Sequence, residues 1–168
     1  MVTLDVRIAR GFDMRVIYND IVRPPAELEQ ELQLTFLEKP ELLKQSDIVS
    51  LHVPLTAKTA ALINHDTLTL LQPAAILINA SRGAVVDQAA LIEFLQAGRI
   101  AGAALDVFEQ EPPDSDSPLL QMENVIVTPH MGGAAREAVE RNFRWGYENI
   151  LRVARGETAR NLVTIDEL

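Results

Sequence analysis

The sequence contains no cysteine in its 168 residues, which excludes disulfide bonds, thiolate catalysis and cysteine-ligated metal sites. Positive charge is also scarce, with 15 Lys and Arg against 24 Asp and Glu and a formal net charge of -9. Nucleic acids and anionic membranes attract basic surfaces, so neither is expected as a partner. No apolar run approaches the ~18 residues of a membrane span, and no signal-peptide core is present at the N-terminus. We therefore expect a cytoplasmic protein.

Short apolar segments alternate with helical patterns along the chain. Strands are expected at residues 14–19, 47–53, 75–79, 101–105 and 125–127, with a weaker one at 33–37. Several are continuous apolar runs, which is typical of strands buried on both faces of a parallel sheet. Helices are expected at 3–10, 40–45, 64–71, 87–97 and 134–154, and the acidic, proline-rich residues 109–118 are expected to form a loop. The sequence thus predicts an α/β fold with a mostly parallel sheet and helices on both faces.

Polar residues follow the expected carboxyl ends of the strands, where open parallel sheets bind their ligands. They are Asp20, then His52-Val53-Pro54, then Ala80-Ser81-Arg82-Gly83, then Asp106 with Glu109 and Glu111, and finally His130. If the sheet is doubly wound, these segments converge on one edge. There they would supply a carboxylate for a ribose, an Arg, a second carboxylate and a His.

Three longer motifs give this arrangement a specific meaning. They are Ile78-Asn79-Ala80-Ser81-Arg82-Gly83-Ala84-Val85-Val86-Asp87, the segment from Ala101 to Pro112, and the segment from Asn124 to Ala134. In sequence, order and spacing they resemble the motifs of the D-isomer-specific 2-hydroxyacid dehydrogenases, which include phosphoglycerate dehydrogenases and glyoxylate/hydroxypyruvate reductases. The resemblance runs from about Phe12 to Val163. It implies the Rossmann-like NAD-binding domain of such an oxidoreductase.

The resemblance implies a catalytic set of Arg82, Glu111 and His130. Arg82 would hold the substrate carboxylate, since a guanidinium can bind it bidentately. His130 would be the general acid/base, because an imidazole exchanges protons near neutral pH. Glu111 would pair with His130 and favour the imidazolium, and its spacing of five residues after Asp106 selects it over Glu109. Outside these motifs, Arg82 would more often be a surface residue and Glu111 one solvated charge among several.

The resemblance also implies NAD as the cofactor, with no metal. The expected contacts are Asp20, His52, Val53, Pro54, Ala80, Ser81, Arg82, Asp106, His130, Gly132 and Gly133. A carboxylate at Asp20 can accept both hydroxyls of the adenosine ribose, which favours NAD over NADP, although Arg23 nearby could tolerate a 2′-phosphate. His52 could instead be a core histidine, and Asp106 a cap at the end of its strand.

Other residues are interpreted as structural. His65 is expected to begin a helix, and Phe143 and Trp145 are expected to pack in a core or in a dimer interface. A homodimer is expected because the resemblance implies one and because apolar surface left without a partner tends to associate.

The sequence contains no G-x-G-x-x-G, the turn by which a dinucleotide fold receives a pyrophosphate. Residues before Gly11 should hold that turn and the strand that precedes it, but the chain begins Met1-Val2-Thr3-Leu4. The family's substrate domain has no counterpart either. We therefore expect a chain truncated at the N-terminus, with an incomplete dinucleotide-binding domain at 1–155 and an exposed tail at 156–168. Loss of the first strand should let the second strand meet the fourth, or leave an apolar slot.

Two functions remain open at this point. The chain is either part of an enzyme that transfers a hydride between NAD and a small D-2-hydroxyacid or 2-oxoacid, and is inactive alone, or a non-catalytic binding or oligomerisation module derived from that family. An in-frame G-x-G-x-x-G in the coding sequence upstream of Met1 would favour the first.

Overall fold

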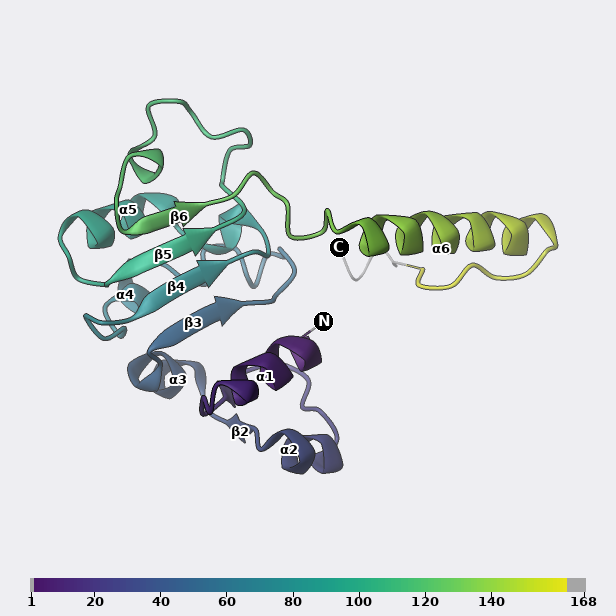
Figure 1. Cartoon of the computed structure of the whole chain (residues 1–168), viewed down its shortest axis with the longest axis horizontal. Helices are drawn as coiled ribbons and strands as arrows, with labels where there is room; N and C mark the ends of the chain where they lie inside the picture. Colours follow the sequence, from purple (N-terminus) through teal and green to yellow (C-terminus); the bar gives the residue numbers. More distant parts are fainter. Residues whose placement is uncertain (1, 163–168) are drawn as a thin grey trace. The chain divides into compact units, whose positions relative to one another are not determined.

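The computed structural model describes residues 2–162, with side chains from residue 5 onward. These residues form two compact units that divide between Val127 and Thr128. The first unit contains the β-strands with most of the helices, and the second contains one long helix and the segment after it (Figure 1).

The first unit alternates helices and strands. Its amino-terminal part contains α1 (Val2–Gly11), β1 (Ile17–Tyr18), α2 (Ala26–Leu32), β2 (Thr35–Phe36) and α3 (Lys39–Gln45). The remainder contains β3 (Ile48–Leu51), α4 (His65–Leu68), β4 (Ile76–Asn79), η1 (Gly83–Val85), α5 (Gln88–Gln96), β5 (Gly102–Leu105), η2 (Pro118–Leu120) and β6 (Val125–Val127).

All the strand pairs are parallel, and they form two sheets with the orders β1-β2 and β3-β4-β5-β6. In the larger sheet Leu51 pairs with Asn79, and Asn79 pairs with Leu105, so the carboxyl ends of β3, β4 and β5 are level. The parallel α/β fold predicted from the sequence is confirmed. Two outcomes were expected for a missing first strand. The first was that the second and fourth strands of the complete fold, here β1 and β3, pair with each other. This does not occur, because β1 and β3 share no ladder.

The core of the first unit lies on one face of the four-stranded sheet. Leu51, Leu77 and Leu105 are buried there against residues of α4 and α5 such as Leu68 and Leu91. Alternate residues of β3 and β4 are exposed, with Ile48 at 42% and Ile76 at 39%. The expectation that these strands are buried on both faces is therefore wrong within this unit, because their side chains alternate between a packed face and an open one.

Capping side chains fix the starts of α4 and α5. The Asp87 carboxylate accepts the Ala90 N–H at 3.0 Å and begins α5, as predicted. Asn64 and Thr67 form a reciprocal capping box that begins α4 at His65, where a helix start was expected.

The structure departs from the sequence-based expectation most clearly at α2, β1 and α4. The helix α2 was not anticipated, because among its residues only Leu28 and Leu32 carry an apolar periodicity. The strand β1 spans Ile17–Tyr18 rather than residues 14–19, since β2, with which it pairs, has two residues. The helix α4 ends at Leu68, three residues early.

The second unit is α6 (Arg136–Ala154) with a segment that folds back beside it (Figure 1). Asn149 and Arg160 exchange two hydrogen bonds, and Arg152 Nε donates to the Thr158 carbonyl at 2.9 Å. The expected tail is therefore mostly exposed but bound to α6 as far as Arg160, and residues 163–168 lie outside the described residues. Among the described residues, no helix has the length and apolar content needed to cross a membrane.

Candidate functional site

A buried asparagine holds the loop that follows β4. Asn79 is 1% exposed, and its Nδ2 donates to the Arg82 carbonyl at 3.0 Å. Its Oδ1 accepts the backbone N–H of Ser81 at 3.1 Å and the Ser81 hydroxyl at 2.8 Å. One side chain thus fixes both ends of the Ser81-Arg82 turn. The sequence motif included Asn79, but its positioning role was not anticipated.

The same loop lies directly against the segment after β5. A Cβ on Gly83 would be 1.8 Å from the Phe108 carbonyl oxygen, so only a glycine allows the two backbones to approach this closely. Arg82 is exposed, and its Nη1 donates to the Ser81 carbonyl at 2.7 Å. The Arg82 guanidinium is therefore presented at the carboxyl end of β4 by a braced loop.

The segment after β5 carries the two candidate glutamates, and their backbone partners differ. Glu109 Oε1 accepts the Gln88 N–H at 3.0 Å at the start of α5, and its own N–H donates to Gln88 Oε1 at 3.3 Å. Glu109 is thus a helix-capping residue. Glu111 is exposed, and its Oε1 accepts the Phe108 N–H at 3.0 Å. This difference supports Glu111, rather than Glu109, as the candidate carboxylate.

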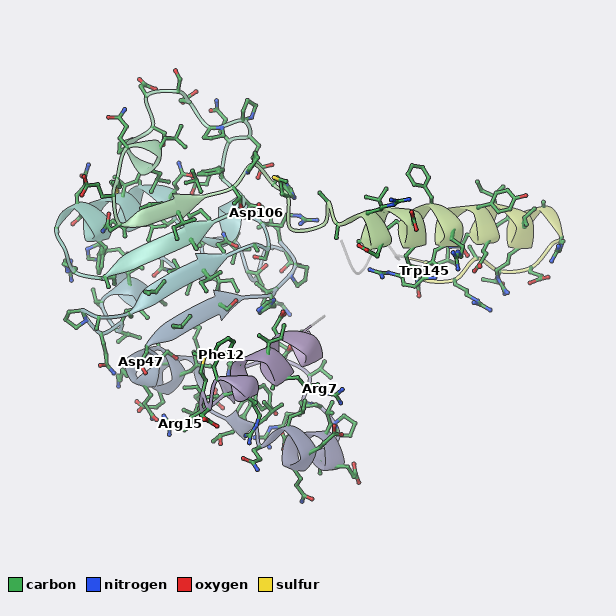
Figure 2. The ribbon with its side chains drawn as sticks, in the orientation of Figure 1. Arg7, Phe12, Arg15, Asp47, Asp106 and Trp145 are labelled. Carbon is green, nitrogen blue, oxygen red and sulfur yellow. The ribbon has the colours of Figure 1, made fainter. Side chains whose placement is uncertain are left out.

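Asp106 follows β5 at the same edge of the sheet (Figure 2). It is 8% exposed, and its N–H donates to the Asn79 carbonyl at 2.9 Å, which extends the ladder between β4 and β5 by one residue. Asp106 and the Ala80-Ser81-Arg82 loop therefore lie at neighbouring strand ends.

The second unit contains the predicted site residues His130, Gly132 and Gly133. His130 follows β6 by three residues, has a positive φ of 52°, and donates its N–H to the Thr128 carbonyl at 3.1 Å. Gly132 and Gly133 follow it after one residue, Met131. The prediction that Arg82, Glu111 and His130 share one crevice, with Glu111 and His130 closest, stays a prediction.

The turn after β1 carries Asp20. Its Oδ1 accepts the Val22 N–H at 3.1 Å, so the carboxylate is held at the carboxyl end of the strand. The Arg23 guanidinium carbon lies 4.2 Å from the centre of the Phe36 ring. This stacking holds the guanidinium of Arg23, the residue considered above for a 2′-phosphate, against the Phe36 ring.

Tyr18 supports this turn from within β1. Its ring meets Phe36 edge to face at 5.5 Å between centroids, and its hydroxyl donates to the Glu29 carboxylate. The pKa of Tyr18 is raised above its usual value, first by loss of hydration and then by the bond to Glu29.

The loop after β3 is anchored by hydroxyl groups. His52 Nε2 is 2.9 Å from the Ser50 hydroxyl, and its Nδ1 is 3.9 Å from Asp5 Oδ2. The His52 side chain is 32% exposed, so the alternative of a core histidine is wrong. Thr59, which sequence reasoning missed, donates its hydroxyl to the Pro54 carbonyl at 2.6 Å and fixes the turn that follows Val53.

Comparison with known proteins shows what this arrangement is similar to. The model of the D-isomer specific 2-hydroxyacid dehydrogenase NAD binding domain matches residues 5–132. Glyoxylate reductase of Korarchaeum cryptofilum is 47% identical over 157 residues, which are 94% of this chain and 47% of that protein. D-3-phosphoglycerate dehydrogenase of Methanocaldococcus jannaschii is 40% identical over 165 residues, 97% of this chain and 31% of that protein.

Solved structures agree with these relatives. The TT0316 protein of Thermus thermophilus matches with a TM-score of 0.85 at 40% identity, over 94% of this chain and 49% of that one. The NAD-complexed D-isomer specific 2-hydroxyacid dehydrogenase of Lactobacillus delbrueckii matches with a TM-score of 0.85 at 31% identity, over 96% and 52%. This chain thus spans about half the length of the glyoxylate reductases that it matches.

Proposed function

The chain belongs to the D-isomer specific 2-hydroxyacid dehydrogenase family through its NAD-binding domain, and from this premise we propose that it holds NAD for the interconversion of a small D-2-hydroxyacid and its 2-oxoacid. The observation that carries the proposal is the Ser81-Arg82 turn, which Asn79 braces at the level carboxyl ends of parallel strands. NAD supplies the hydride chemistry when bound. Relatives named glyoxylate reductase point to a 2-oxoacid as small as glyoxylate.

In this proposal each catalytic side chain has one task. Arg82 binds the substrate carboxylate through its guanidinium, which is exposed and held by a rigid loop. His130 gives a proton to the carbonyl oxygen during reduction and takes it back during oxidation. Glu111 pairs with His130 and stabilises its protonated form. Glu109 has no part, because it caps α5.

We propose that these residues contact the two nucleosides of NAD. Asp20 would bind the adenosine ribose, and His52, Val53 and Pro54 would lie on the adenine side. Ala80, Ser81 and Asp106 would contact the nicotinamide side, which their position after β4 and β5 supports. Gly132 and Gly133 after His130 complete the proposed contacts. We propose no contact to the pyrophosphate, because the sequence has no G-x-G-x-x-G turn to bind it.

We expect the 168 residues by themselves to bind NADH weakly and to reduce no 2-oxoacid at a useful rate. The backbone donors of a phosphate turn are lacking in the sequence, and misplacement of reacting groups by about 1 Å already costs on the order of 100-fold in rate. Calorimetric titration with NADH, followed by an absorbance assay with glyoxylate and hydroxypyruvate, measures both quantities. Micromolar affinity with steady turnover would contradict this expectation.

We further propose that the cofactor is NAD rather than NADP. The Asp20 carboxylate would repel a 2′-phosphate, and Arg23 stacks on Phe36. Asp20→Asn keeps an acceptor for the Val22 N–H but removes the charge, so NADH affinity should fall about tenfold while NADPH affinity holds or rises. Glu27→Gln is the matched control, since it removes one exposed charge from the first turn of α2. An unchanged ratio of NADH to NADPH affinity in Asp20→Asn would show that Asp20 does not select the cofactor.

A homodimer is the oligomeric state that we propose. Within the second unit, Val139, Phe143, Tyr147 and Ile150 recur at helical spacing on α6, and all are exposed. The returning segment binds the other side of α6 through Asn149 and Arg152 and leaves this stripe open. Phe143 and Trp145 are exposed at 77% and 52%, so the alternative that they pack in a core is wrong for this unit. Apolar surfaces of this kind usually bind a partner.

Sedimentation velocity tests the dimer and its location. We expect Phe143→Glu to shift the chain toward monomer, because it places a charge in the centre of the stripe. Trp145→Glu adds the same charge about 200° further round the helix and should leave the dimer intact. A monomeric unmodified chain at high concentration would count against the proposal.

A further inference from the structure

A serine and a histidine meet at the end of β3. Ser50 is in the strand and His52 follows it, and residues two apart in a strand project from the same face. The Ser50 hydroxyl oxygen is 2.9 Å from His52 Nε2, which is a hydrogen-bond distance. The end of β3 thus presents a hydroxyl group next to a ring nitrogen that is able to take its proton.

Asp5 of α1 lies on the other side of the imidazole ring. Its Oδ2 is 3.9 Å from His52 Nδ1, which is too long for a direct hydrogen bond but close enough for attraction between charges. A carboxylate on this side of the ring favours the tautomer that carries its hydrogen on Nδ1. In that tautomer Nε2 has no hydrogen and accepts the one from the Ser50 hydroxyl.

The three side chains are accessible from solvent on the first unit. Ser50 is exposed, and the side chains of His52 and Asp5 are 32% and 49% exposed. Two exposed apolar side chains are close by in the sequence of the same elements. Ile48 precedes Ser50 by two residues on β3, and Ile8 follows Asp5 by about one turn of α1. A small ester could therefore reach the hydroxyl and place a short acyl chain against apolar surface.

We propose that Ser50 is an acyl-accepting nucleophile, with His52 as its general base and Asp5 as a positioning residue for that base. A Ser-His pair oriented by a carboxylate performs acyl transfer on several unrelated folds, so it is identified by its geometry and not by its place in the chain. The substrate class is a short aliphatic ester of a phenol, because a phenoxide is a good leaving group. The reaction requires no NAD, so its test is independent of the proposed hydride transfer.

The proposed reaction has two steps. In the first, the Ser50 oxygen forms a bond to the acyl carbon, its proton passes to His52 Nε2, and the phenoxide leaves and takes that proton. In the second, a water molecule gives a proton to His52 and attacks the acyl carbon, and the bond to the Ser50 oxygen breaks as that oxygen receives the proton. The products are a phenol and a carboxylic acid, and Ser50 is restored.

The probe is p-nitrophenyl butyrate. Release of nitrophenolate is followed by absorbance, and the acylated residue is identified by mass spectrometry of fragments from acid-quenched protein. We expect the butyryl group on Ser50, and Ser50→Ala should release nitrophenolate about tenfold more slowly or worse. His52→Gln removes the base and should lower the rate about 100-fold, the lower end of the range for general-base catalysis. The position of the butyryl group is read from the unmodified chain, so it does not depend on the folding of any variant.

His65→Gln is the matched control for His52→Gln. His65 Nδ1 also lies 3.9 Å from an aspartate, Asp66, but its ring meets the ring of Phe94. We expect the rate of His65→Gln to stay within about twofold of the unmodified chain, since general-base assistance requires a hydroxyl within hydrogen-bond reach of the base.

The role of Asp5 is tested through its charge. Asp5→Asn should lower the rate about threefold, a small effect because the ion pair is exposed, and Asp5→Glu should restore most of it. Salt at about 1 M should lower the rate of the unmodified chain but not that of Asp5→Asn, because screening removes an attraction that the variant lacks.

Three results would overturn the proposal. A butyryl group on His52 with Ser50 unmodified would show that the imidazole itself is the nucleophile. Equal rates for Ser50→Ala and the unmodified chain would show that the serine takes no part. Equal losses in His52→Gln and His65→Gln would show that any exposed imidazole accounts for the reaction.

Discussion

Replacing Gly83 with alanine is expected to destabilise the first unit by about 3 kcal/mol, the upper part of the usual range for overpacking. The new Cβ would lie 1.8 Å from the Phe108 carbonyl oxygen and 1.9 Å from its carbon. Both are backbone atoms, so no side chain can rotate away, and the loop after β4 must separate from the segment after β5. Urea unfolding followed by far-ultraviolet circular dichroism measures the loss.

Gly11→Ala is the control for this prediction. It adds the same methyl group at the end of α1, where nothing lies within 4 Å of the added carbon. The free energy of unfolding of Gly11→Ala should differ from that of the unmodified chain by less than about 1 kcal/mol. Because Gly83 follows the Ser81-Arg82 turn, the alanine variant should also speed amide exchange at Ser81, whose N–H binds Asn79. Equal unfolding midpoints for Gly83→Ala and Gly11→Ala would contradict the close approach.

The strands and the main helix starts could be predicted because their signals are local. The apolar run 75–79 contains β4, and the carboxylate of Asp87 starts α5, as the sequence indicated. The helix α2 could not be found in this way, because Leu32 is buried by tertiary packing that two leucines do not indicate. The two-residue length of β1 likewise depends on what pairs with it, which is a property of the sheet and not of the segment.

The site was predictable as a set of segments and less so as a set of contacts. Motif spacing selected Glu111 over Glu109, and the capping of α5 by Glu109 gives a physical reason for that choice. The stacking of Arg23 on Phe36 joins residues from different elements and has no sequence signal. The hydrogen bonds by which Asn79 holds the Arg82 loop also have no sequence signal. An asparagine at the end of a strand cannot be distinguished from an ordinary polar residue until its partners are known.

The second large effect is expected at Phe94, where alanine should cost about 3–5 kcal/mol of unfolding free energy. Phe94 is 1% exposed and is the largest fully buried side chain of the first unit. The Arg99 guanidinium carbon lies 3.8 Å from its ring centre, and the His65 ring meets its edge at 5.3 Å. Truncation leaves a cavity under the sheet and removes both ring contacts, one of which joins α5 to α4.

Phe12→Ala is the matched control, because it removes the same atoms from a ring that is 77% exposed. Its free energy of unfolding, measured by urea titration, should stay within about 0.5 kcal/mol of that of the unmodified chain. Phe94→Ala should unfold at much lower urea, and amide exchange in β3, β4 and β5 should accelerate together, since these strands share one core with α5. If exchange accelerated in α5 alone, the helix would be a separately stable layer, and the carboxyl strand ends that carry Arg82 and Asp106 would not depend on it. The shared core predicts the opposite: the loss of one ring from α5 loosens the whole edge that is proposed to receive the nicotinamide.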